Sequence, residues 1–175
     1  MDNIVLLRKT PELFQLCQDL GFTETLFLDD VAVLEENNLE KFRKKALLEK
    51  QKGKFVIAKP RNEDMLRFIL EKTAVDMVYG LEMIHPSDSV HYVRGSLDQV
   101  LCQIAAAKGK MIGFSFSSLL HSSDGKLLGR MKQNMKLCKK YKVKMILSNF
   151  SVSPEELRSK KDLAAFQRVL EKEKK

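Results

Sequence analysis

Acidic and histidine residues follow several short apolar runs of the chain, and these residue types can hold a catalytic metal ion. The candidates are Asp29, Asp30, Glu82, His85 and His91, because a parallel α/β fold brings the ends of its strands together. The sequence has no His-x-His after its first apolar run and no HExxH pattern. We therefore expect no metal site, and a metal-dependent phosphoesterase on an incomplete barrel is kept as the alternative function.

The common motifs of phosphate binding and nucleophilic catalysis are also missing from the sequence. Neither GxGxxG nor GxxxxGK[ST] occurs, and no Gly-x-Ser-x-Gly turn surrounds Ser115 or Ser117. We predict that this chain carries no catalytic residue.

The positive charge of the chain is concentrated in one segment. The 175 residues have a net charge of +8. Residues 108–144 carry ten basic side chains and a single acidic one, Asp124, whereas residues 1–107 carry 14 basic and 17 acidic ones. Such a localised excess is typical of proteins that bind nucleic acid, although a solvated, lysine-rich surface has the same composition.

A long helix is expected from residue 124 to 142, inside this basic segment. At 100° per residue, Leu127, Met131 and Cys138 share one face and predict the buried side. Four lysines lie roughly opposite, and no acidic residue stands four positions away to pair with them. A polyanion would relieve their mutual repulsion, so we predict that they contact RNA phosphates. They are Lys132, Lys136, Lys139 and Lys140.

A second basic cluster precedes the last expected helix, residues 162–171. Arg158 and Lys161 stand beside backbone N–H groups at a helix start, which is a favourable place for a phosphate group. We expect Asp162 or Ser159 to cap this helix, with Asp162 as the first choice, and Asp162 to orient Arg158.

Short apolar runs alternate with amphipathic ones along the whole chain. Strands are expected at residues 4–7, 26–28, 55–58, 75–79, 82–84, 111–116 and 143–147, and Ser96 is expected to cap a helix that ends at residue 107. Several strands are apolar without alternation, which predicts a parallel sheet covered by helices. A complete eight-fold barrel typically needs about 250 residues, so a single domain, residues 1–175, would hold a doubly wound sheet or a compact or incomplete barrel.

Cellular location is predicted from what the sequence lacks. The N-terminus does not read as a secretory signal, and no apolar run approaches the roughly 20 residues that span a bilayer. Cys17, Cys102 and Cys138 are interpreted as buried thiols in a reducing compartment. We expect a cytoplasmic protein.

Two long segments closely resemble the archaeal ribonuclease P protein component 3 family, whose eukaryotic homologue is the thirty-kilodalton subunit of ribonuclease P and MRP. These segments are GFSFSSLL, residues 113–120, and GRMKQNMKLCKKYKV, residues 129–143. Residues 95–101, GSLDQVL, and 157–163, LRSKKDL, look like two further elements of the family. Over residues 1–94 only the order of strands and helices matches.

The resemblance implies a TIM-barrel-like fold and a non-catalytic subunit of a ribonucleoprotein that removes the 5′ leader of precursor tRNA. The RNA would perform the chemistry with Mg²⁺ that the RNA itself binds, and the protein would bind no cofactor. The implied partners are the ribonuclease P RNA, precursor tRNA through the holoenzyme, and component 2, with which the family forms a heterotetramer. The metal histidines of the polymerase and histidinol phosphatase superfamily, which has a similar fold, are absent from this sequence.

Further contacts are assigned on this basis. Arg94 and Arg130 would contact RNA at a loop and at the edge of the long helix, and Ser115, Phe116 and Ser117 would support component 2 or the RNA. The family's Ser-Gly-Ala is replaced by SNF at residues 148–150, and the proline of its LRSPRDL element by Lys160. A protein-interaction scaffold whose lysines only confer solubility is a third interpretation.

Overall fold

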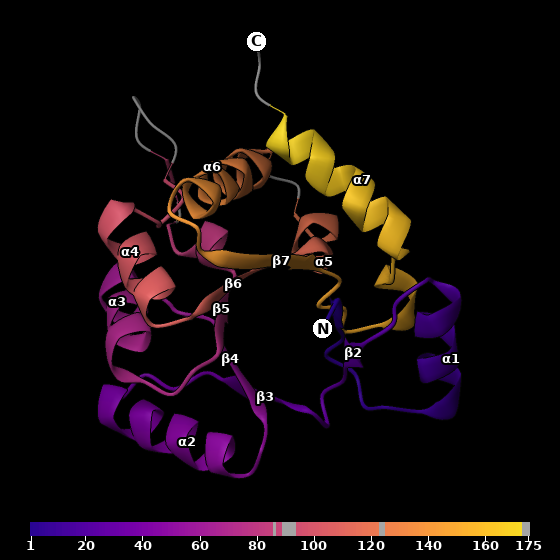
Figure 1. Cartoon of the computed structure of the whole chain (residues 1–175), viewed down its shortest axis with the longest axis horizontal. Helices are drawn as coiled ribbons and strands as arrows, with labels where there is room; N and C mark the ends of the chain where they lie inside the picture. The colour runs from indigo at the N-terminus through magenta and orange to yellow at the C-terminus, as the bar shows by residue number, and fades with distance from the viewer. Residues whose placement is uncertain (86, 89–93, 123–124, 173–175) are drawn as a thin grey trace.

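Seven short parallel strands form the centre of the molecule, and helices surround them (Figure 1). The computed structural model describes residues 1–85, 87–88, 94–122 and 125–172. Strands β3 to β7 form a five-stranded sheet in sequential order, and β1 and β2 form a separate two-stranded sheet. The strands are β1 (Asn3–Ile4), β2 (Thr25–Leu26), β3 (Val31–Leu34), β4 (Phe55–Ala58), β5 (Met77–Tyr79), β6 (Met111–Ser115) and β7 (Lys144–Ser148).

Helices α2, α3, α4, α6 and α7 contribute to the large core on the outside of the five-stranded sheet, whereas α1 packs beside the two-stranded sheet. Helix α6 follows α5 directly, without a strand among the described residues between them. Asn38 and Asn62 cap α2 and α3 with their side-chain oxygens, as helix-start residues of this type do. The helices are α1 (Pro11–Asp19), α2 (Leu39–Gln51), α3 (Glu63–Lys72), α4 (Gln99–Ala107), α5 (Phe116–Leu120), α6 (Lys126–Lys140) and α7 (Lys160–Glu171). Two 3₁₀ turns, Leu81–Met83 and Pro154–Glu156, complete the described elements.

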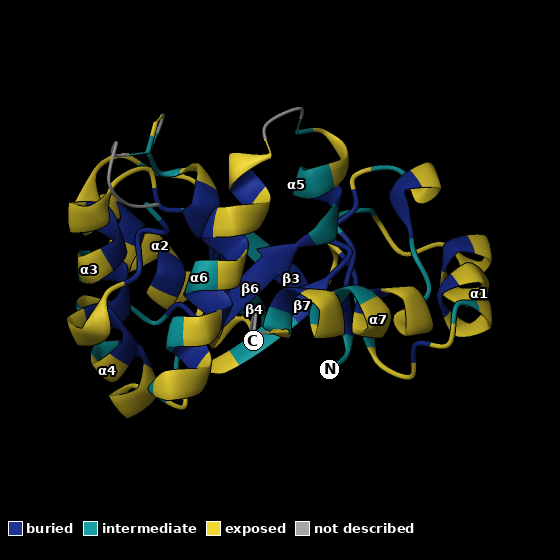
Figure 2. Cartoon of the chain, turned by 90° about the horizontal axis from the view of Figure 1, so that it is seen from above, coloured by how far each residue is buried: buried dark blue, intermediate teal, exposed yellow. Residues whose placement is uncertain are grey.

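The strands are buried on both faces, as their apolar sequences predict. Val56 and Val78 belong to the large core between sheet and helices, whereas Ile57 and Met77 belong to a smaller core inside the barrel. Figure 2 shows the buried strands between helices whose outer faces are exposed. The prediction of an α/β, TIM-barrel-like fold is therefore confirmed. The predicted buried thiols, Cys17, Cys102 and Cys138, are free and buried.

The barrel closes between its last and first strands through a buried polar network. The Ile4 N–H donates to Ser148 Oγ over 2.7 Å, and the Phe150 N–H donates to the Ile4 carbonyl over 2.8 Å. The Asn149 amide donates to Asn3 Oδ1 over 3.0 Å, and Ser148 Oγ donates to the same oxygen over 3.0 Å. In the described residues no ladder joins β2 to β3, so the barrel is incomplete, as predicted.

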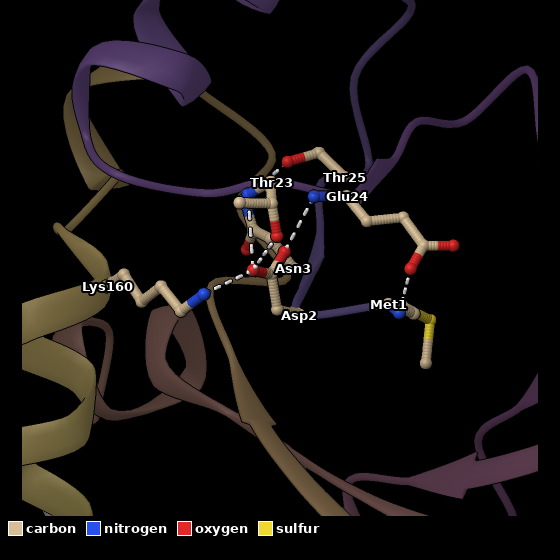
Figure 3. Close-up of polar contacts among 7 residues, drawn as sticks. All are labelled: Met1, Asp2, Asn3, Thr23, Glu24, Thr25 and Lys160. Carbon is tan, nitrogen blue, oxygen red and sulfur yellow. Dashed lines mark hydrogen bonds and ion pairs between the residues drawn. The ribbon is translucent and has the colours of Figure 1, made fainter.

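The N-terminal residues are held by a second polar cluster (Figure 3). Asp2 accepts hydrogen bonds from the Thr23 hydroxyl over 2.9 Å and the Glu24 N–H over 3.0 Å, and it pairs with Lys160 of α7 over 2.6 Å. The Met1 amino group pairs with Glu24. Partial burial opposes ionisation of Asp2, but these donors outweigh it and hold the pKa of its carboxyl well below the usual value.

Three local predictions were wrong. Residues 82–84 form no strand, because Gly80, in a left-handed conformation at φ +70°, turns the chain into the first 3₁₀ turn. Ser96 also has a left-handed backbone, and the extended Asp98 caps α4 in its place. Strand β3 was missed because the Asp29–Asp30 pair was interpreted as a strand exit, whereas it directly precedes β3.

Replacing Asn149 with alanine is expected to lower the free energy of unfolding by about 2–4 kcal/mol. The substitution removes the side-chain partner of the Arg158 N–H and carbonyl and one of the donors to the Asn3 carboxamide oxygen. An unpaired buried polar group costs about 1–3 kcal/mol. Urea unfolding followed by circular dichroism measures the change. The exposed Asn37→Ala variant is the control and is expected to stay within about 0.5 kcal/mol of the original chain. Equal stability of the two variants would contradict a closing role for Asn149.

Candidate nucleic-acid interface

Helix α6 presents four exposed lysines on its outer side. We call Lys132, Lys136, Lys139 and Lys140 the α6 lysine face. The opposite side packs into the large core through Met131, Met135 and Cys138, as the 3.6-residue periodicity predicts. The structure thus places all four lysines where an external polyanion could reach them.

Helix α7 partly neutralises this face, which the sequence did not predict. Lys139 forms an ion pair with Glu171 over 2.6 Å, and the Lys132 ammonium donates to the Lys172 carbonyl over 2.7 Å. The prediction that the lysines of this face are unpaired was therefore wrong, and the Lys140 ammonium also lies 5.4 Å from the Tyr141 ring centroid. The partners of Lys132 and Lys139 come from another helix, and no i±4 rule within α6 can reveal them.

A cavity of about 770 Å³ lies between α6 and α7. Met135 and Leu170 contribute its apolar walls, and the α6 lysine face and Glu171 contribute its charged groups. Figure 1 shows the end of α7 beside α6 and the start of α7 near α1. The lysines therefore border a concave surface and not a flat one.

The second basic cluster lies at the start of α7, whereas the cavity beside α6 lies at the end of α7. Helix α7 has 12 residues, so at 1.5 Å per residue its two ends are about 18 Å apart. Ser159 caps the helix by accepting from the Asp162 N–H, and its hydroxyl donates to the Asp162 carboxylate over 2.7 Å. The Arg158 guanidinium donates to the carbonyls of Glu155 and Leu157. Asp162 thus neither caps α7 nor orients Arg158, contrary to prediction, whereas Lys161 is exposed.

Arg130 is not on the surface, and we withdraw it from the predicted RNA contacts. Its side chain is 5% exposed and pairs with Asp88 over 2.7 Å. The same guanidinium donates to the carbonyls of Glu82 and His85 over 2.9 and 2.7 Å. These bonds attach α6 to the segment that follows β5, so Arg130 has a structural role.

Arg94 lies in a different cavity, of about 560 Å³, whose lining also includes Glu63, Asp64, Asp98 and His85. Arg94 is half-buried, and its N–H donates to Asp88 over 3.0 Å. The carboxylates of this cavity make it a mixed environment, unlike the α6 lysine face. Arg94 therefore does not extend that face.

Ser115, Phe116 and Ser117 act inside the fold. Ser115 caps α5, and the Ser117 hydroxyl donates to Glu156 over 2.7 Å. Both serines are buried, and the Phe116 ring packs edge-on against Phe166 of α7 at 5.3 Å between centroids. Both serine side chains are engaged in contacts within the fold, and both also line the cavity at the carboxyl end of the barrel.

The geometry does not assemble the predicted alternative metal site. Asp29 and Asp30 lie at the start of β3, where the Asp30 carbonyl accepts from Phe55 at the start of β4. His85 follows β5 and contacts Glu63 over 2.8 Å in a separate cavity. His91 lies outside the described residues. Within the described part of the chain, no three His, Cys, Asp or Glu side chains are grouped as metal ligands.

Glu82 is a buried carboxyl group whose role the sequence did not reveal. It is 2% exposed, and its Oε1 has no hydrogen-bond partner in the described residues. Burial raises its pKa to about 7, and the positive charge of Lys59 opposes this shift. The sequence signal that could have revealed its burial is its position as an acidic residue within the apolar stretch 77–84.

Two curated proteins with the same name are similar in sequence to this chain. The chain is 32% identical over 111 residues to ribonuclease P protein component 3 of Methanosarcina mazei, and 34% identical over 112 residues to that of Methanosarcina acetivorans. Each alignment covers 62% of this chain and 43% of the relative. The resemblance to ribonuclease P protein component 3 is confirmed. This chain spans under half the length of these component 3 relatives, and no family model matches it.

Solved structures show the same fold. A chain in a cryo-EM structure of archaeal ribonuclease P with mature tRNA matches 98% of this chain and 83% of its own length, with a TM-score of 0.69 at 16% identity. An amidohydrolase crystal structure matches 90% of this chain and 41% of its own length, with a TM-score of 0.53 at 9% identity.

None of the helices that the structure describes has the length and apolar character of a membrane-spanning segment.

Glu82 is expected to make stability fall as the pH rises. Its pKa of about 7 in the folded chain exceeds the unfolded value near 4.5, so the folded state binds the extra proton between these values. The free energy of unfolding that this proton contributes is fully present below about pH 4.5 and is lost as the pH rises to about 7. Its largest value is about 3 kcal/mol. Urea unfolding from pH 5 to 8 should show this loss in the original chain and in the exposed control Glu35→Gln, but not in Glu82→Gln. Identical pH profiles for all three would refute the assignment.

Proposed function

We propose that this chain is a protein subunit of the ribonuclease P ribonucleoprotein, which binds its RNA and supports removal of the 5′ leader from precursor tRNA. The similarity to component 3 supports this role. The α6 lysine face is the observation that carries the RNA contact, because it is exposed, basic and bordered by a cavity. Polyanion binding there would release counterions and offset lysine repulsion.

The proposal assigns the chemistry to the RNA, with Mg²⁺ bound by the RNA and no cofactor on the protein. Its partners are the ribonuclease P RNA, precursor tRNA through the holoenzyme, and component 2 in a heterotetramer. Cytoplasmic location belongs to the same proposal. Lys132, Lys136, Lys139 and Lys140 would contact phosphates, and the contacts of Lys132 and Lys139 with α7 would rearrange. Arg158 and Lys161 form a second contact at the start of α7.

Changing Lys132, Lys136 and Lys140 together to alanine is expected to weaken binding to the cognate ribonuclease P RNA about tenfold or more. The slope of log K against log salt should fall by about 2, since each lost phosphate contact removes about 0.7–0.9. Filter binding at several salt concentrations measures both. The matched control is the Lys41/Lys44/Lys45 triple alanine on α2, which removes the same charge from another exposed helix.

Cleavage of precursor tRNA at lowered Mg²⁺, with the RNA, component 2 and this chain, tests the subunit role. Stimulation that requires this chain and is reduced by the α6 variant, but not by the α2 variant, supports the proposal. Equal effects of the two variants would mean that only net charge matters. Cleavage by the protein without RNA would instead favour the phosphoesterase.

A further inference from the structure

The carboxyl end of the barrel opens into a cavity of about 420 Å³, which we call the barrel mouth. Its lining includes Lys59, Ser118 and His121, and the apolar side chains of Met83 and Val152. Met83 and Val152 are 40% and 58% exposed, so apolar surface lies uncovered there. Small-molecule sites have volumes of about 300–1,000 Å³, and barrel folds of this type carry them at this end.

Lys59 is a cation whose side chain is held in place by packing against the backbone of Gly80. It follows β4, and its side chain crosses the backbone of Gly80 so closely that a Cβ there would lie 3.1 Å from Lys59 Cε. Because Gly80 has no side chain, the aliphatic part of Lys59 can pack directly against its backbone. Lys59 is half-buried, and its ammonium has no hydrogen bond or ion pair with any residue in the described ranges. A partly desolvated ammonium of this kind is favourable for binding an anion.

The carboxylates near the barrel mouth form no ion pair with Lys59 in the described part of the chain. Glu156 is already bonded to the Ser117 hydroxyl over 2.7 Å and to the His121 ring over 2.6 Å. Glu82 is buried, and its pKa of about 7 leaves it partly protonated at neutral pH. The adjoining cavity, which Lys59 also lines, adds Glu35 and Arg61, one charge of each sign. The mouth therefore places the ammonium of Lys59, which pairs with no carboxylate of the described residues, beside an apolar wall.

We propose that the barrel mouth binds a small phosphomonoester attached to an apolar or planar group, of the size of a nucleoside monophosphate. Lys59 would pair with the phosphate, the Ser118 hydroxyl would donate to it, and Met83 and Val152 would cover the apolar group. This site is separate from the α6 lysine face, which lines another cavity. The inference does not rest on the proposed RNA-binding function.

Titration of the full chain with AMP, adenosine and inorganic phosphate tests the site by calorimetry and by amide chemical shifts. AMP is expected to bind saturably and to shift the amides of Gly80 and Ser118, with adenosine and phosphate at least tenfold weaker. Lys59→Met should weaken AMP binding about tenfold or more, because a charge-assisted hydrogen bond is lost. Lys44→Met, on exposed α2, removes the same charge elsewhere and should leave affinity unchanged.

A second pair of variants tests the same site independently, in case the Lys59→Met variant does not fold. Val152 is exposed on the rim, so Val152→Glu should weaken AMP binding and Val152→Lys should strengthen it. A 5′-phosphorylated RNA trinucleotide, compared with AMP, distinguishes an RNA end from a free nucleotide as the source of the phosphate. Absence of saturable AMP binding at millimolar concentration would overturn the proposal. So would binding that responds to Lys136→Met and not to the variants of Lys59 and Val152.

Discussion

The buried amide of Asn149 is the contact on which the barrel depends. The seven strands form two separate sheets, and the polar network of Asn3, Ser148 and Asn149 joins the end of one to the start of the other. A polar network in a protein interior is strong when every member has a partner, and costly otherwise. Ser148 and Asn149 of the segment at 148–150 therefore contribute the polar side chains that close the barrel.

The same amide also positions the candidate interface. The Asn149 side chain accepts from the Arg158 N–H over 2.9 Å and donates to the Arg158 carbonyl, which holds the segment that leads into α7. The far end of α7 then contributes Glu171 beside Lys139 and Leu170 beside Met135. Closure of the barrel therefore determines how much of the α6 positive charge is compensated by carboxylates of the chain itself.

The candidate site was only partly predictable. The α6 lysine face follows from helical periodicity, because residues spaced at 3.6 share a side. Arg130 also lies on the core side of that helix, next to Asn134, yet its charge suggested the surface. Its burial depends on Asp88 and on two carbonyls after β5, which are distant in the sequence. An arginine is buried only where such acceptors converge, and tertiary packing alone brings them there.

The sequence by itself determined the alternation of strands and helices, the caps at Asn38 and Asn62, and the two-sided burial of the strands. Each of these depends on hydrogen bonds or periodicity within a few residues. Only the tertiary structure decided how the barrel closes, that Asp29 lies apart from His85, and that Lys139 meets Glu171. It also decided that Lys59 forms no ion pair within the described residues. These outcomes depend on the register and packing of elements far apart in the chain, which local pattern does not encode.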